Sequence, residues 1–211
     1  MTTDLFRNTA PRIPGLRVKF DVISESQERE LIAEIDEIDM PHFQFQAWVS
    51  KRRARSFGWL YDFRDAAFGP TDPIPPFLLP LKTTAAGFAG LPVDDIVQVS
   101  LIKYEAGAGI GWHRDRPELD AVIGVSLGAE ATMRFRRRTE AGFERASVDL
   151  PPRSIYLLDG EVRYEWEHSI APMTATRWSI TFRGLSEKGK RKAAAEIADL
   201  PKHRLSEHRS L

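Results

Sequence analysis

The chain has 211 residues and a mass of 23.9 kDa, and 42% of its residues are hydrophobic, which is enough for one domain with a substantial core. The formal net charge is zero, which argues against indiscriminate coating of nucleic acid. Cysteine is absent, so disulfides, thiolate metal sites and cysteine nucleophiles are excluded, and the composition suits a cytoplasmic protein. No apolar run is long enough for a membrane span, and the first residues show no signal-peptide pattern.

Two helices are expected in the N-terminal half. Residues 24–38 begin with a capping-box pair, Ser24 and Gln27. Their apolar residues fall on one helical face, at Leu31, Ile32, Ile35 and Ile38. The second helix begins within the proline-rich segment 73–81 and ends near Gly90, because proline is tolerated in a first helical turn and glycine favours a helix end.

From Ile96 onwards the pattern changes to short segments with period two. Glycine, proline or aspartate separates six strand-like segments, at 96–104, 121–128, 131–138, 145–150, 154–160 and 177–183. Such a series is typical of a sandwich, barrel or jelly roll. The polar segment that follows contains a possible helix at 188–200. We therefore expect a single domain over residues 1–185 and a polar, basic tail over residues 186–211.

His113 and Asp115 form an H-x-D pair directly after a glycine-rich turn. On an extended segment both side chains face the same way and could reach one metal ion, although such a pair can also relay a proton or arise by chance. A facial metal triad requires one more histidine. His168 is the best candidate, because the other histidines lie upstream of the strand-rich half or in the polar tail, at His42, His203 and His208.

The last predicted strand separates apolar from polar side chains. Its apolar face carries Trp178, Ile180 and Phe182, and its polar face carries Arg177, Ser179, Thr181 and Arg183. The polar face either meets solvent or forms a polar interior that holds an anion, since arginine makes bidentate contacts with carboxylates. The residues alone leave both alternatives open.

Together these features resemble the AlkB family of Fe(II)- and 2-oxoglutarate-dependent dioxygenases. The chain has an H-x-D pair, then a histidine, then two arginines with five residues between them, in the family's order. Four segments are also similar to family segments: "SFGWLYDF", "PIPPFLLPL", "KYEAGAGIGWHRD" and "HSIAPMTATRWSITFRGL". The resemblance implies an α+β, mainly β fold: a double-stranded β-helix (jelly roll) core with flanking N-terminal helices. The catalytic β-rich part would cover about residues 95–185.

The resemblance also implies a role for each matched residue. Fe(II) would be bound by His113, Asp115 and His168, with 2-oxoglutarate and O₂ as co-substrates. Arg177 would pair with the distal carboxylate of 2-oxoglutarate, helped by Tyr104 and Ser179, and Arg183 would lie near the carboxylate closest to the metal.

Two positions depart from the family pattern. Ile102 stands where the family commonly has an asparagine, so an amide donor to the co-substrate is missing. Pro117 stands where DNA-repair members often have an acidic residue that reads the damaged base. Glu118, the next residue, is the candidate to replace that acid.

The implied function is oxidative demethylation of N-alkylated bases in nucleic acid, as in DNA repair, with a flipped or single-stranded base in DNA or RNA. Aromatic residues at 57, 59, 61 and 63 are expected to share one strand face, with Trp59 and Tyr61 holding the target base. Arg52, Arg53 and Arg55 would neutralise phosphates, although a basic run is often a solvated face and a single aromatic is often core. We expect a monomer that does not bind membranes.

Two alternatives remain at this point. The same oxygenase chemistry could act on a protein or a small molecule, which would be favoured if Trp59 and the three arginines proved buried or ion-paired. The chain could also be a non-catalytic nucleic-acid-binding module, which would be favoured if the purified protein held no iron.

Overall fold

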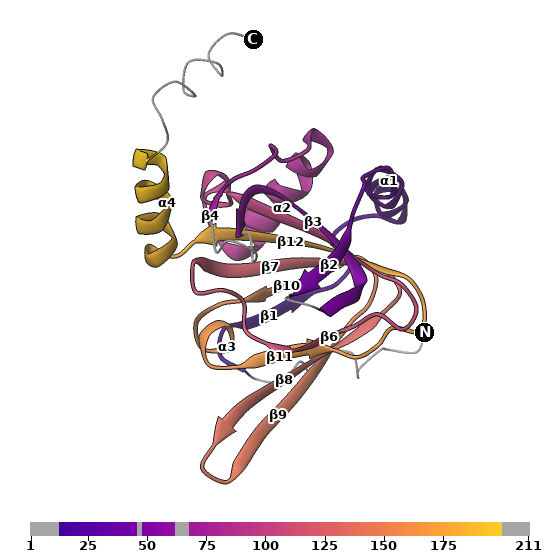
Figure 1. Ribbon diagram of the computed structural model, residues 1–211. Coiled ribbons are helices and arrows are strands. Elements are labelled where there is room, and N and C mark those ends of the chain that lie inside the picture. Colours follow the sequence, from indigo (N-terminus) through magenta and orange to yellow (C-terminus); the bar gives the residue numbers. More distant parts are fainter. Residues whose placement is uncertain (1–12, 46–47, 62–67, 200–211) are drawn as a thin grey trace.

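The fold consists of two facing antiparallel sheets, with helices packed on the outer side of the larger sheet (Figure 1). This computed structural model describes residues 13–45, 48–61 and 68–199, and describes side chains for residues 13–42, 50–59 and 69–196. The arrangement is the jelly roll that the sequence predicts, with strands dominating and helices at the flank. Within the described residues, no helix is long and apolar enough to cross a membrane.

The larger sheet has eight strands in the order β1-β10-β7-β12-β5-β3-β2, with β4 paired to β3. These strands are β1 (Leu16–Lys19), β2 (His42–Phe45), β3 (Trp48–Tyr61), β4 (Phe68–Pro70), β5 (Gln98–Tyr104), β7 (Leu119–Gly128), β10 (Ser154–Leu158) and β12 (Arg177–Leu185). The smaller sheet has the order β6-β11-β8-β9. Its strands are β6 (Ile110–His113), β8 (Ala131–Thr139), β9 (Gly142–Leu150) and β11 (Glu167–Ile170). Every strand-like segment predicted from the sequence is confirmed.

The described helical elements are α1 (Glu25–Asp36), η1 (Pro76–Leu78), α2 (Leu79–Ala89), η2 (Val93–Asp95), α3 (Gly160–Tyr164) and α4 (Glu187–Asp199). The capping box that begins α1 is present: Gln27 N–H donates to Ser24 Oγ, and Ser24 N–H donates to Gln27 Oε1. The second predicted helix is also confirmed. It starts with the short helix η1 and ends where Gly90 adopts a left-handed conformation, with φ of 75°.

The larger sheet is buried on both faces. On β12, Ile180 and Phe182 face α1 and α2 and are fully buried in the helix-side core. The alternate residues face the smaller sheet, and among them Arg177 and Ser179 are also buried. The polar face of this strand therefore forms a polar interior, not a solvent face. Period two along β12 thus separates the apolar support of the sheet from the interior that faces the second sheet.

Glu28 anchors α1 to the sheet. Its side chain is only 8% exposed, and its two oxygens accept from the Gly128 N–H and from Arg153 Nη1, each at 2.8 Å. Gly128 ends β7, so this contact holds the helix against the middle of the larger sheet. A buried carboxylate with two charge-assisted partners contributes to stability mainly because neither partner can be left unpaired.

We expect Glu28→Ala to lower the free energy of unfolding by about 2–4 kcal/mol, because it leaves the part-buried Gly128 N–H without an acceptor and the Arg153 guanidinium with the longer contact to Asp21. Glu34→Ala, at an exposed position of the same helix, should change stability by less than about 0.5 kcal/mol. Urea unfolding of both variants measures the difference. Equal effects of the two substitutions would show that Glu28 does not anchor the helix.

Candidate metal centre

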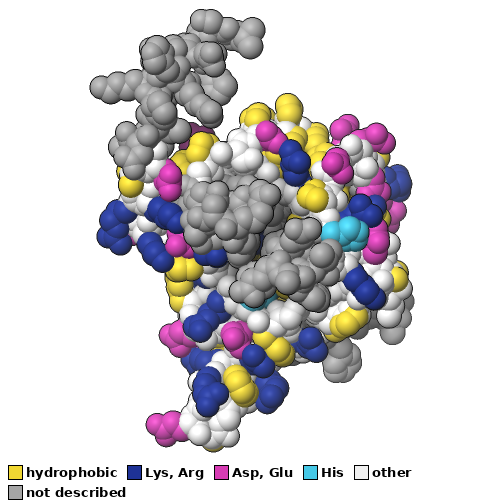
Figure 2. Space-filling model, in the orientation of Figure 1, with side chains coloured by type: hydrophobic (Ala, Val, Ile, Leu, Met, Phe, Trp, Pro, Cys, Tyr) yellow, Lys and Arg dark blue, Asp and Glu magenta, His cyan; other side chains and the backbone are white. Residues whose placement is uncertain are grey.

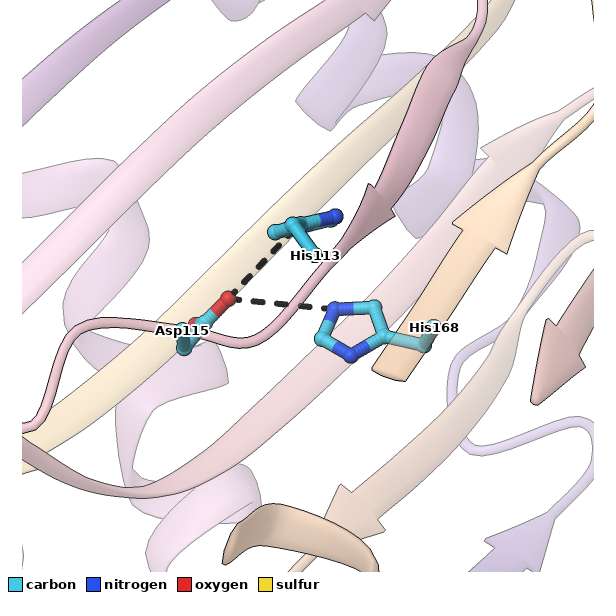
Figure 3. A group of neighbouring side chains, drawn as sticks. All are labelled: His113, Asp115 and His168. Carbon is cyan, nitrogen blue, oxygen red and sulfur yellow. Dashed lines mark ion pairs between the residues drawn. The ribbon is translucent and has the colours of Figure 1, made fainter. Parts of the chain in front are cut away.

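Three side chains meet between the two sheets. His113 and His168 are direct partners in the pairing of β6 with β11, and Asp115 lies two residues beyond His113 (Figure 3). Asp115 Oδ1 lies 3.7 Å from His113 Nε2 and 3.8 Å from His168 Nε2. The candidate ligand atoms of the three residues all lie within 4.8 Å of one another. The structure thus brings together the triad that the sequence predicted.

The protonation of the two imidazoles suits a metal site. His113 Nδ1 lies 2.9 Å from the carbonyl oxygen of Gly111, which can only accept, so Nδ1 carries the proton and Nε2 offers a lone pair to the centre of the group. Burial, reinforced by the neighbouring His113, lowers the pKa of His168 to about 3 despite the nearby Asp115. His168 is therefore neutral near pH 7, as a metal ligand must be.

Asp115 is held by Arg183. The Arg183 Nε donates to Asp115 Oδ2 at 2.7 Å, which leaves Oδ1 facing the two histidines. Burial alone would raise the pKa of the Asp115 carboxyl, but the nearby groups, chiefly the charge of Arg183, outweigh burial and hold it well below its usual range. The carboxylate is thus ionised and oriented. The resemblance predicted that Arg183 lies near the 2-oxoglutarate carboxylate closest to the metal. In the structure, Arg183 pairs with the metal ligand Asp115 itself.

Arg177 lies deeper on the same face of β12. Its side chain is fully buried, and its Nε donates to Ser126 Oγ at 3.0 Å. Its guanidinium carbon lies 5.3 Å from the centre of the Tyr104 ring. Both terminal nitrogens are buried without a hydrogen-bond partner among the described residues. A buried guanidinium with two unpaired nitrogens is costly unless an anion binds it, and its fork matches a carboxylate.

Further polar side chains lie around Arg177. Ser179 lies next along the same face of β12 and pairs with Ile102 on β5 and Ser126 on β7. Tyr156 lies flat over Gly124: a Cβ at Gly124 would stand 2.1 Å from Cζ of the Tyr156 ring. Burial raises the pKa of Tyr156 to about 12, against the nearby charge of Arg177, so its hydroxyl stays protonated. Ser126 and Tyr156 were not singled out from the sequence, although both follow the period-two pattern of their strands.

Arg163, on α3, fixes the loop that carries Asp115. Its side chain is buried, and its three nitrogens donate to the carbonyl oxygens of Asp115, Arg116, Leu119 and Asp120 at 2.6–3.2 Å. One guanidinium thus binds both ends of the segment between the metal carboxylate and β7. Sequence reasoning missed this residue, because no spacing rule links an arginine on a short helix to a loop more than 40 residues earlier.

The three arginines expected to contact phosphates are engaged within the protein. Arg52 is 9% exposed, and burial lowers its pKa. Arg53 pairs with Glu105 at 3.5 Å, and Arg55 pairs with Asp72. A strand places Arg52 on the face opposite to Arg53 and Arg55, so the three cannot form one basic surface. Their role in binding phosphate stays a prediction, and the structure adds no support to it.

The expected row of aromatic residues is interrupted at Gly58. This glycine has φ of 82°, a left-handed conformation that ends the regular alternation of β3. Phe57 packs in the helix-side core, whereas Trp59 is partly buried beside Leu119, Leu185 and Ala193. The expectation of one shared face is therefore wrong for Phe57 and Trp59. The side chains of residues 61 and 63, including the predicted base contact Tyr61, lie outside the described residues.

Glu118 and Trp59 are brought together by α4. Glu118 is 5% exposed; its Oε1 pairs with Lys188 of α4 at 3.1 Å, and its Oε2 has no hydrogen-bond partner among the described residues. Burial would raise the pKa of Glu118, but the hydrogen bond from Lys188, together with a backbone hydrogen bond and the charges of Lys188 and Arg116, outweighs burial and lowers the pKa. The segment predicted as a tail thus contributes α4 to the surroundings of Glu118 and Trp59. The sequence offered no chemical signal for this arrangement.

The fold and the triad between the two sheets define a class of protein. The family model of the 2OG-Fe(II) oxygenase superfamily matches residues 15–205. The chain belongs to this superfamily and is a dioxygenase that uses Fe(II), 2-oxoglutarate and O₂. The paired imidazoles, the carboxylate and the unpaired Arg177 nitrogens fit these groups.

Within the superfamily the chain is AlkB-like. It is 30% identical over 164 residues to the tRNA (carboxymethyluridine(34)-5-O)-methyltransferase alkbh8 of Xenopus tropicalis, a match that covers 75% of this chain but 25% of that protein. It is 26% identical over 187 residues to the alkylated DNA repair protein ALKBH8 homolog of Arabidopsis thaliana, covering 75% of this chain and 51% of that protein. The chain thus spans between a quarter and about half of these two relatives.

Two further similarities extend over most of both partners. An uncharacterised protein of Acanthamoeba polyphaga mimivirus is 29% identical over 195 residues, covering 83% of this chain and 87% of that protein. The solved structure of OsALKBH1 superposes with a TM-score of 0.59 at 15% identity, covering 82% of this chain and 97% of that one. The structural likeness supports the fold alone.

We expect Arg163→Lys to weaken Fe(II) or Co(II) binding by about 10–100-fold, because an ammonium cannot reach all four carbonyls and the Asp115 loop loses its fixed position. Titration of the metal-free protein, followed by the absorption of bound Co(II), measures the affinity. Lys19→Ala, at an exposed position, is the control. If the variant kept normal metal affinity while its melting temperature fell, Arg163 would be structural only.

We expect Arg177→Met to raise the concentration of 2-oxoglutarate needed for half-maximal stabilisation by about 30-fold or more, because the distal carboxylate loses a charge-assisted bidentate contact. Thermal melting with and without the co-substrate measures this shift. Without co-substrate the variant should be at least as stable as the parent, since an unpaired buried charge has been removed.

The control for Arg177→Met is 2-oxobutyrate, which lacks the distal carboxylate. The parent protein should bind it far more weakly than 2-oxoglutarate, and the variant should bind the two acids about equally. Preserved discrimination in the variant would place the distal carboxylate elsewhere.

Proposed function

We propose that this chain oxidatively demethylates N-alkylated bases in nucleic acid. Support comes from the pairing of a complete oxygenase site with Glu118 and Trp59, a buried carboxylate and an aromatic ring on the segments that flank it. The names of its relatives refer to tRNA and to alkylated DNA. These names make RNA at least as strong a candidate as DNA. The methyltransferase named in one relative lies beyond what this proposal covers, because the match spans a quarter of that protein.

Fe(II), when bound with 2-oxoglutarate and O₂, supplies an oxidant that hydroxylates an alkyl group, after which the group leaves as an aldehyde and 2-oxoglutarate ends as succinate. His113, Asp115 and His168 would hold the metal. Arg177, with Tyr104 and Ser179 beside it, would hold the distal carboxylate of 2-oxoglutarate. Arg183 would keep the metal carboxylate ionised and turned towards the histidines.

The target base would have to leave its stack to reach a metal between two sheets. Glu118 Oε2 is an unpaired acceptor on the loop after Asp115, and it could accept from an exocyclic amine or a ring N–H of the flipped base. Trp59 packs against the small cluster of Leu119 and Ala193, and Leu119 follows Glu118, so the ring and the carboxylate lie in the same region. In this proposal Glu118 reads the base edge and Trp59 supports its stacking.

A second candidate function is supported by a specific observation. Arg52 is buried and Arg53 and Arg55 are ion-paired, which removes the basic patch expected beside the aromatic strand. The same oxygenase chemistry acting on a protein or a small molecule would not need that patch. The complete triad and the family membership give no support to the third alternative, a non-catalytic binding module.

Succinate release with 2-oxoglutarate across methylated RNA, methylated DNA and methylated peptides tests the proposal. We expect turnover with at least one methylated oligonucleotide, with formaldehyde released in the same amount as succinate. Glu118→Gln should lower kcat/KM for that oligonucleotide by at least about tenfold. Uncoupled succinate release without a substrate should be unchanged in Glu118→Gln. Turnover confined to peptides or small molecules would replace the proposed function with the second candidate.

Three further expectations from the sequence stay predictions. They are the cytoplasmic location, the monomeric state, and the division of the chain into a domain over 1–185 and a tail over 186–211.

A further inference from the structure

The outer face of the smaller sheet carries a set of arginines that the oxygenase site does not use. Along β8, Met133 and Phe135 point inward to the core, so the alternate residues point outward. The cross-strand pairing of Arg136 with Arg145 and of Arg138 with Phe143 places the β9 residues on the same face. Trp112 on β6 joins them through ring contacts. We call this surface the arginine face; its residues are Trp112, Arg134, Arg136, Arg138, Phe143 and Arg145.

Two aromatic rings hold these arginines in place. The guanidinium carbons of Arg134 and Arg136 lie 5.3 and 4.6 Å from the centre of the Trp112 ring. Around Phe143, the guanidinium carbons of Arg136, Arg138 and Arg145 lie 4.8, 5.8 and 5.5 Å from the ring centre. Guanidinium groups stacked on rings keep their N–H edges directed away from the ring, where they can bind an anion.

The charge of the arginine face is incompletely compensated. Arg136 pairs with Glu167 at 2.6 Å, and Arg134 donates to the Ser169 hydroxyl and has no ion-pair partner among the described residues. Within the described part of the chain, neither Arg138 nor Arg145 has an ion-pair partner. Arg136 and Arg145 are direct cross-strand neighbours, an arrangement that destabilises a sheet when both carry the same charge.

Arg137, the residue between the outward arginines, provides an internal comparison. It points to the other side of β8, where Glu144, Glu161 and Glu165 all lie within 3.1 Å of its guanidinium. Among the described residues, the neighbouring elements therefore supply three carboxylates to the arginine on one side of β8 and one, Glu167, to the arginines on the other. An arginine set kept with so little counter-charge, at a cost to the sheet, is explained by a partner that brings the negative charge.

The position of this face limits what it can contact. The β8–β9 hairpin projects from the body of the molecule (Figure 1), and Lys and Arg side chains gather over it (Figure 2). Trp112 directly precedes the metal ligand His113, but successive strand residues point to opposite faces. A molecule bound to the arginine face therefore lies outside the sheet, adjacent to the metal centre without entering it.

We propose that the arginine face binds the sugar–phosphate backbone of a nucleic acid at nucleotides outside the target base. This inference rests on the proposed function for its substrate. Spaced guanidinium groups suit repeated phosphates, and the rings between them suit stacking on unpaired bases. The face would supply phosphate contacts independent of Arg52, Arg53 and Arg55, whose own role in binding phosphate stays a prediction. An acidic protein is the competing partner, and the test separates it.

The test compares the parent with Arg138→Ala/Arg145→Ala, which removes two exposed arginines remote from the metal ligands. Fluorescence anisotropy measures binding of a long unmodified RNA at several salt concentrations, so the result does not depend on turnover. We expect severalfold weaker binding and a log–log salt slope smaller by about 1.4, or about 0.7 for each lost phosphate contact. Lys19→Ala/Arg29→Ala removes the same charge at exposed positions elsewhere and should leave both values unchanged.

Turnover then separates this inference from the proposed function. With a methylated mononucleotide, which has no nucleotides outside the target base, parent and variant should have equal kcat/KM. With a long methylated oligonucleotide, the variant should have a severalfold higher KM and unchanged kcat. Turnover of both substrates with no effect of the variant would overturn the inference and leave the proposed function intact. Absence of turnover in the parent, together with slope-dependent RNA binding at this face, would overturn only the proposed function.

Two binding outcomes would overturn the inference directly. One is an unchanged RNA affinity and salt slope in Arg138→Ala/Arg145→Ala. The other is tighter binding of polyglutamate than of RNA by the parent, lost in the same variant, which would assign the face to an acidic protein.

Discussion

The ion pair between Arg183 and Asp115 is the contact on which the metal centre depends. It joins the last strand of the larger sheet to the loop that follows β6, and so connects the two sheets at the point where the ligands meet. The two oxygens of the Asp115 carboxylate have different partners: Oδ2 accepts from Arg183, while Oδ1 faces the histidines. Without this cation, a carboxylate so deeply buried would take up a proton more readily and lose its value as a ligand.

Arg183 is itself fixed by neighbours on the same polar face. Its Nη1 donates to Thr181 Oγ1 at 2.9 Å and to Ser100 Oγ at 3.3 Å. Burying such a polar row costs free energy, and the opposite face of β12 offsets it by placing Ile180 and Phe182 in the helix-side core. Precision at the site and stability of the sheet therefore come from alternate residues of one strand. Arg163 performs the corresponding task from the other side, by holding the backbone on which Asp115 lies.

Most of the fold and the metal ligands could be predicted from the sequence, because both depend on local patterns. Period two marked the strands, the capping box marked α1, and only His168 stood in the right context to complete the triad. What the sequence did not reveal was partly the local geometry of β3 and partly contacts between distant segments. The turn at Gly58 separates Phe57 from Trp59, and a strand cannot place Arg52 beside Arg53 and Arg55. The pairing of Glu118 with Lys188 requires α4 to fold back onto the loop after Asp115, which no local pattern reveals.

The zero net charge of the chain conceals a separation of charge along the molecule. Acidic side chains crowd α1 and the residues after it, while the arginine face lies on the projecting hairpin (Figures 1 and 2). A neutral protein with separated charge has no general attraction for a polyanion, but it orients one that approaches. α1 covers the outer side of the larger sheet, and the arginine face lies on the outer side of the smaller one, next to the strand that carries His113. Under the proposed function, a nucleic acid would therefore be repelled from the helix-covered end and drawn towards the end nearer the metal centre. This charge distribution combines two properties that net charge alone cannot combine: a weak general affinity for polyanions, and a preferred direction of their approach.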